Sequence, residues 1–86
     1  MKKIEIYTTS HCPFCIKAKS LLKKKRIKFT ETDVSNDEAL REKMSAMANG
    51  ARSVPQIFAD NTYIGDCDKI YKLDQEKKLD KLLGLE

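Results

Sequence analysis

Two cysteines stand three positions apart, at Cys12 and Cys15, with Pro13 and Phe14 between them. In a helix this spacing is about one turn, so both sulfurs lie on one face and can close a small disulfide ring. A cysteine in the first turn faces unpaired backbone N–H groups and the positive end of the helix dipole, which favour the nucleophilic thiolate. The spacing therefore predicts thiol–disulfide exchange through a redox-active Cys12–Cys15 disulfide, with Cys12 attacking and Cys15 resolving the mixed disulfide.

The third cysteine, Cys67, leaves an odd number, which excludes a fully paired disulfide framework within one chain. Half of a zinc site is another interpretation of the Cys12–Cys15 pair, but it needs two further ligands, and only His11 and Cys67 are available. Incidental buried cysteines are a third interpretation, which leaves Pro13 between them unexplained. We therefore expect redox chemistry and no metal.

Length and composition indicate a single domain over residues 1–86, with 35% charged and 41% hydrophobic residues. This apolar content is enough for one modest core. No apolar run approaches the roughly 18 residues of a transmembrane helix, and the first residues lack the apolar stretch of a signal peptide. We therefore expect a cytoplasmic protein with no membrane partner, in a compartment where thiols stay reduced.

The net charge is +4, and the densest basic cluster runs from Lys23 to Arg26, with Lys28 just beyond it. Basic runs occur in nucleic-acid patches, but no aromatic or Gly-rich RNA-binding motif accompanies this one. Cationic side chains also complement the dipole at the C-terminus of a helix. We expect the run to close a helix, and we expect no nucleic-acid partner.

The elements that must position the cysteines follow from periodicity. Alternating apolar residues predict a strand over residues 2–8, and an apolar stripe predicts a helix from Pro13 to the basic run. β-branched residues predict a second strand over 27–34. A capping box, with Ser35 as N-cap and Glu38 reaching back, predicts a second helix that ends near residue 48.

The second half of the chain begins with strands over 56–59 and 62–64, joined by a two-residue turn at Asp60-Asn61. A short helix is expected over 67–73, and Asp74 is expected to cap a last helix. The resulting βαβ-ββα order predicts an α/β fold with a four-stranded mixed sheet flanked by helices. The first two strands are parallel because of their helical crossover, and the last two form an antiparallel hairpin.

With these motifs in this order, the chain resembles a dithiol glutaredoxin, a member of the thioredoxin-fold superfamily, over essentially all of its length. Four segments carry the resemblance, namely Ile4-Glu5-Ile6-Tyr7-Thr8, Cys12-Pro13-Phe14-Cys15, Ser53-Val54-Pro55-Gln56-Ile57-Phe58, and Ile64-Gly65-Asp66-Cys67-Asp68. The resemblance implies a glutathione-disulfide oxidoreductase that reduces protein–glutathione mixed disulfides and protein disulfides. Glutathione is then the co-substrate, and disulfide-bearing or glutathionylated proteins are the partners of a monomer.

The resemblance also implies where glutathione binds. The backbone of Val54, before a proline that is cis in the family, would pair with the cysteinyl part. Asp68 would take the γ-glutamyl ammonium group, beside Cys67. The resemblance likewise implies that the Phe14 ring walls the pocket and that Pro55 lies opposite the Cys12–Cys15 pair. Because Thr9 stands where the family commonly has a lysine, we expect Arg41, or less directly Arg52, to meet the carboxylate.

Two positions depart from the family pattern. Thr9 stands where the family commonly has a lysine, and Gly65-Asp66 stands where it often has two glycines. Asp66 lacks the freedom of glycine at positive φ and adds a negative charge near an anionic ligand. We therefore expect glutathione to bind more weakly here than to a typical relative.

The resemblance leaves two other functions open. One is a small redoxin that is reduced by thioredoxin reductase and serves ribonucleotide reductase. The other is an iron–sulfur-binding module, whose relatives usually have Cys-Gly-Phe-Ser or lack the proline after the first cysteine. Asp68 and the Ser53-Val54-Pro55 segment favour glutathione over the first alternative, and Pro13 with both cysteines argues against the second.

Overall fold

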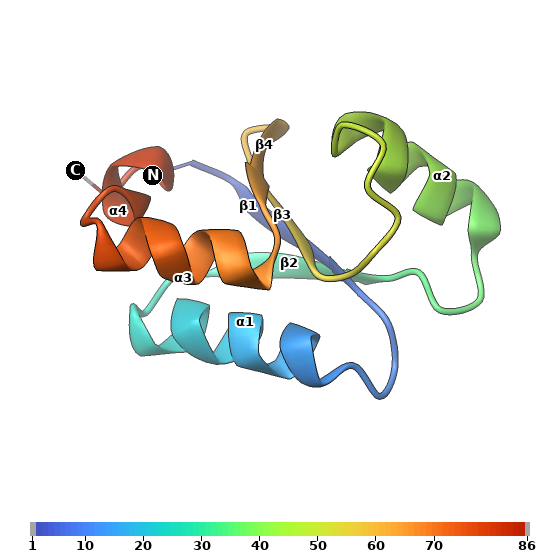
Figure 1. Ribbon diagram of the computed structural model, residues 1–86, viewed down its shortest axis with the longest axis horizontal. Helices are drawn as coiled ribbons and strands as arrows, with labels where there is room; N and C mark the ends of the chain where they lie inside the picture. The colour runs from blue at the N-terminus through green and yellow to red at the C-terminus, as the bar shows by residue number, and fades with distance from the viewer. Residues whose placement is uncertain (1, 86) are drawn as a thin grey trace.

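The four strands form one sheet in the order β2-β1-β3-β4 (Figure 1). The computed structural model describes residues 2–85. In it, β1 (Ile4–Thr8) pairs parallel with β2 (Phe29–Asp33) and antiparallel with β3 (Gln56–Ala59). β3 pairs antiparallel with β4 (Thr62–Gly65). The predicted mixed α/β sheet is confirmed, and β1 lies at its centre, where the strand leads directly to the cysteines.

Helices cover both faces of this sheet (Figure 1). α1 (Pro13–Lys24) and α3 (Cys67–Gln75) lie side by side on one face, and the short α4 (Leu79–Leu82) follows α3. α2 (Glu38–Met47) lies on the opposite face. The predicted helices are therefore all present, within a few residues of the expected bounds. Every helix within residues 2–85 is too short or too polar to cross a bilayer.

Alternation along β1 divides the core between the two faces. Ile4 and Ile6 are buried under α1 and α3, together with residues such as Leu22 and Ile70. Tyr7 points the other way and packs edge-on against Phe58, at 5.5 Å between ring centroids, in the smaller core beneath α2. Because side chains alternate along a strand, Thr8 lies on the same face of β1 as Ile4 and Ile6, and it is buried on the α1 side.

The hairpin turn forms as expected. Asp60 and Asn61 both have positive φ, 48° and 65°, which is the backbone of a type I′ turn that Asp and Asn tolerate. The Asp60 carboxylate also accepts a hydrogen bond of 2.8 Å from the backbone N–H of Lys3. This contact fixes the turn to the start of β1.

Two predicted caps are wrong. The N-cap of α2 is Asp37, whose carboxylate accepts from the backbone N–H of Leu40 at 3.0 Å, because the Ser35 hydroxyl is already engaged by the backbone N–H of Ser10 at 2.7 Å. The residue before α4 is Lys78, which provides no side-chain cap. Asp74 does not cap that helix, because it lies within α3 and pairs with Lys25.

The basic run does close α1, as expected. Lys25 is the C-cap, and its ammonium lies 2.5 Å from Asp74 and 2.7 Å from Asp80. These hydrogen bonds raise the pKa of Lys25. Part of the run therefore joins the end of α1 to α3 and α4.

Candidate functional site

The site begins where β1 turns into α1. Cys12 has an extended backbone (φ −107°, ψ 103°) and is the N-cap of α1, with Pro13 in the first turn. Its Sγ accepts a hydrogen bond of 3.1 Å from the backbone N–H of Cys15. A sulfur held by a free N–H at a helix N-terminus is placed to carry negative charge. The preceding residue, His11, is exposed and has a left-handed backbone (φ 57°).

The two cysteines of the motif differ in exposure. Cys12 is half-buried, whereas Cys15 is only 1% exposed. Burial, followed by the hydrogen bond with Cys12, raises the pKa of the Cys15 thiol to about 12. The more exposed Cys12 sulfur is thus the one that is accessible to an incoming disulfide. The buried Cys15 sulfur is held as a protonated thiol.

A loop from the far side of the sheet faces the cysteines. The Val54–Pro55 peptide bond is cis, and the Val54 carbonyl oxygen lies 3.9 Å from Cys12 Sγ, which donates to it. A cavity of about 150 Å³ opens beside this contact. Its lining brings together segments far apart in the sequence, namely Phe14, Ser53, Val54, Pro55, Asp66, Cys67 and Asp68.

The N-terminus of α3 forms the remaining wall. Asp66 is the N-cap, and its carboxylate accepts from the backbone N–H of Lys69 at 2.9 Å. Asp66 has a φ of −96°, so the predicted strain from replacing glycine is absent; the positive φ, 148°, belongs to Gly65. Cys67 is buried, and burial raises the pKa of its thiol, which argues for a supporting place in the wall. Asp68 is exposed.

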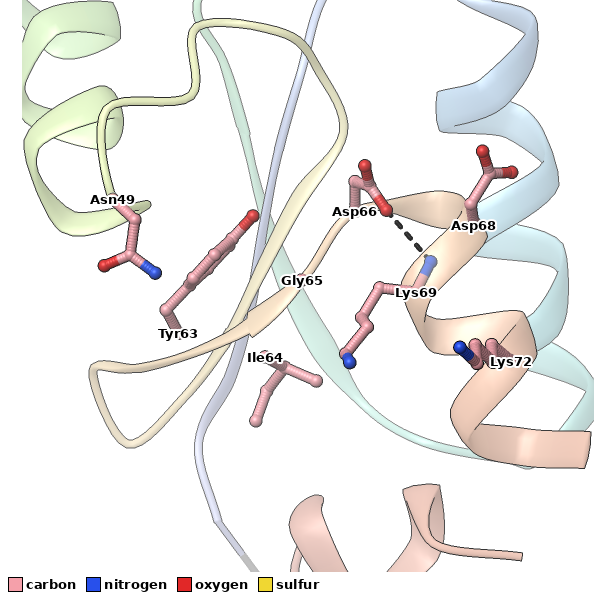
Figure 2. A pocket seen from close by; sticks show the side chains of 8 residues that line it. All are labelled: Asn49, Tyr63, Ile64, Gly65, Asp66, Asp68, Lys69 and Lys72. Atoms are coloured by element: carbon pink, nitrogen blue, oxygen red, sulfur yellow. Dashed lines mark hydrogen bonds between the residues drawn. The ribbon is translucent and has the colours of Figure 1, made fainter. Parts of the chain in front are cut away.

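A second, more open hollow of about 600 Å³ continues past the same helix end (Figure 2). Tyr63 and Gly65 of β4 line one side, and Lys69 and Lys72 of α3 line the other. Asp66 and Asp68 line both hollows. A ligand longer than the smaller cavity can therefore continue into the larger one.

Most residues predicted to bind glutathione meet at this place, but the arginines do not line it. Phe14, Val54, Pro55, Cys67 and Asp68 all line the smaller cavity. Arg41 instead donates from Nε to the backbone carbonyl of Arg52 at 3.0 Å, and Arg52 pairs with Glu38. These contacts direct both arginine side chains to partners that do not line the smaller cavity.

The sequence interpretation missed several residues that shape the site. Ser53 lines the cavity, and its carbonyl oxygen accepts from Gln56 Nε2 at 2.8 Å. The cap at Asp66 was detectable, since an Asp directly before a helix is a common N-cap. A polar cluster behind the cysteines, formed by Thr8, Lys19 and Glu31, gave no sequence signal, because it joins three separate elements. Among residues 2–85, no group of three or more His, Cys, Asp or Glu side chains is arranged to hold a metal ion.

A central β-strand that delivers a C-x-x-C pair to a helix N-terminus, opposite a proline loop, defines a thiol–disulfide oxidoreductase of thioredoxin-like fold. Comparison with known proteins narrows this class. The family model described as Glutaredoxin matches residues 4–64. The chain belongs to the glutaredoxin family.

Individual relatives agree along nearly the whole chain. A probable glutaredoxin of Synechocystis is 57% identical over 81 residues, which cover 94% of this chain and 92% of the relative. Glutaredoxin 3 of Escherichia coli is 45% identical over 83 residues, covering 96% and 99%. The solution structure of a glutaredoxin from Brucella melitensis has a TM-score of 0.85 at 42% identity, covering 96% of this chain and 89% of that one.

Proposed function

We propose that this oxidoreductase depends on glutathione and reduces protein–glutathione mixed disulfides and protein disulfides. One observation carries the proposal: Cys12 lies at a helix N-cap, beside a cavity lined by Phe14, Val54, Pro55 and Asp68. The cavity lies next to the half-buried Cys12 sulfur, where glutathione, the family's co-substrate, must bind in order to react with it. The family itself uses glutathione as its reductant.

In the first step, the Cys12 thiolate attacks a disulfide sulfur, and the backbone N–H of Cys15 supports its charge. A bond forms between Cys12 and the attacked sulfur, and the other sulfur leaves as a thiolate that takes up a proton. With a glutathionylated protein, the product is a Cys12–glutathione disulfide, which a second glutathione reduces. With a protein disulfide, the Cys15 sulfur attacks Cys12 and completes the reduction.

The cavity wall supports this assignment of glutathione. The Val54 backbone stands beside Cys12 Sγ, where an extended cysteinyl residue of the ligand can pair with it. The exposed Asp68 carboxylate suits an ammonium group, and the first turn of α3 suits a carboxylate. Asp66 adds a negative charge at the same edge, and Thr9 supplies no cation, so we propose that glutathione binds more weakly than in relatives with lysine and two glycines.

A coupled assay tests the proposal, with hydroxyethyl disulfide, glutathione, glutathione reductase and NADPH. We expect the wild type to consume NADPH and Cys12→Ser to be inactive, because it lacks the attacking sulfur. Cys15→Ser should retain activity on glutathione mixed disulfides and lose it on protein disulfides, because only the protein disulfides need a resolving thiol. Activity that survives in Cys12→Ser would overturn the assignment.

We propose a reducing, cytoplasmic setting for this activity, because the family's potentials of roughly −200 to −230 mV lie near the poise of the cytosolic glutathione pool. A protein disulfide of ribonucleotide reductase fits the same chemistry, but no observation on this chain favours it over other targets. Activity with thioredoxin reductase in place of glutathione would support that alternative.

A further inference from the structure

The resolving step needs a negative charge on the more deeply buried of the two cysteines, and the site shows how that charge is supported. Cys15 must change from thiol to thiolate before its sulfur can attack Cys12. Burial opposes this change strongly, since Cys15 is 1% exposed. The backbone N–H of Cys15 is also donated to the Cys12 sulfur.

One cation lies on the same side of the helix. Lys19 is one helical turn beyond Cys15, at i+4, so the two side chains project from one face of α1. That face is turned toward the sheet, because the Lys19 ammonium lies 2.9 Å from Glu31 of β2. Its side chain is 24% exposed, which keeps part of its field from being screened by water.

The position of Lys19 is fixed by two further residues. The same Glu31 oxygen that binds Lys19 accepts a hydrogen bond of 2.7 Å from the Thr8 hydroxyl, and Thr8 is 1% exposed. Thr8 ends β1 and precedes Thr9, whose backbone lowers the pKa of Cys15. The Thr8 hydroxyl, followed by Lys19, lowers the pKa of Glu31, so this carboxylate stays charged and holds the ammonium in place.

Other charged groups near the cysteines do not replace this cation. Glu31 and Asp33 on β2 and Asp66 at the N-terminus of α3 are acidic, and Cys67 is a buried thiol. The other basic side chains close in sequence are exposed: His11 precedes the motif, and the Lys17 ammonium lies 4.8 Å from the centre of the Tyr71 ring. Asp33 is held by Ser35 and Ser10. Burial and then the hydrogen bond with Cys12 raise the pKa of Cys15, whereas the Thr9 backbone and, more weakly, the charge of Lys19 lower it.

We propose that Lys19 is the electrostatic partner of Cys15 in the resolving step, and that Glu31 and Thr8 are the positioning residues that hold its ammonium. The inference deepens the proposed function and rests on it. In the step, the Cys15 thiol releases its proton to water and its sulfur bonds to Cys12. The bond between Cys12 and the substrate sulfur breaks, and the leaving thiolate takes up a proton. The cysteine pair is oxidised and the substrate disulfide is reduced.

Stopped-flow kinetics with dithiobis(nitrobenzoate) separates the two steps. With protein in excess, attack by Cys12 releases a first coloured thiolate in a second-order phase. Attack by Cys15 on the resulting adduct releases the second in a first-order phase. Lys19→Gln should slow the second phase about threefold to tenfold, because Cys15 loses a nearby positive charge. The first phase serves as the internal reference.

Two matched variants sharpen the test. Lys19→Arg keeps the charge and should keep the second phase within about twofold of the wild-type rate. Lys23→Gln removes an exposed lysine one turn further along α1, and the second phase should stay at the wild-type rate. Lys19→Gln should also move the rise of the second-phase rate with pH to higher pH, whereas a loss of geometry would lower the rate without moving that rise.

The outcomes separate the two proposals. If the first phase is missing in the wild type, Cys12 is not the nucleophile and the proposed function fails. If the first phase is present but the second is unchanged in Lys19→Gln, or is slowed equally in Lys23→Gln, only the role of Lys19 is overturned.

Discussion

At the scale of single residues, two cysteines of one motif have opposite environments. Cys12 accepts an N–H hydrogen bond at a helix end and contacts Val54, which lines a cavity, while Cys15 is buried. The group that donates to the Cys12 sulfur is the backbone N–H of Cys15. Exposure therefore assigns the order of attack that the proposed mechanism uses.

Asp66 has two effects that substitutions can separate. Asp66→Ala removes the N-cap of α3 and should lower the free energy of unfolding by about 1 kcal/mol, or the melting temperature by roughly 4–8 °C. Asp66→Asn keeps a capping oxygen and removes the charge, so we expect little change in stability and a lower KM for glutathione. Thermal melts and the coupled assay measure the two effects. A KM that rises in Asp66→Asn would show that the carboxylate helps binding.

At the scale of elements, local signals in the sequence were enough to place the strands, the helices and the Cys12 cap. Alternation in β1 and Pro13 at the start of α1 depend only on neighbouring residues. The cap of α2 was wrong because Ser35 and Asp37 are both good caps, and a long-range contact with Ser10 decides between them.

The rest of the site depends on register, which sequence periodicity does not reveal. The parallel pairing sets Glu31 opposite Ile6 and Thr32 opposite Tyr7, so that Glu31 comes within reach of Thr8 and of Lys19 on α1. Likewise, Arg41 was a reasonable cation for a carboxylate ligand, but the fold turns it to the Arg52 carbonyl. The glutathione-binding roles of all these residues stay predictions.

At the scale of the whole molecule, α1 is fixed at both ends. Its N-terminus carries the cysteines, and its C-terminus is joined to α3 and α4 through Lys25. Cores on both faces of the sheet hold β1 between them. The cysteine pair is therefore presented by a central, largely buried strand of the fold.

This burial makes the stability of the reduced protein depend on pH. Cys15 and Cys67 have raised pKa values in the folded state, above the ordinary thiol value of 9.0. From that value upward the unfolded chain loses these protons first, so the free energy of unfolding should fall as the pH rises. Urea denaturation of the reduced protein near pH 7 and at about pH 10 measures the fall. In reduced Cys15→Ala the fall should be smaller; an equal fall would contradict the burial argument.

The central claim, that Cys12 carries the glutathione adduct, is tested most directly by mass spectrometry of Cys15→Ser after exposure to a glutathionylated peptide. Without a resolving thiol the adduct should persist, and peptide mapping should place one glutathione on Cys12. The matched variant Cys12→Ser should form no adduct. A glutathione found on Cys67, or an adduct formed equally well by Cys12→Ser, would contradict the account.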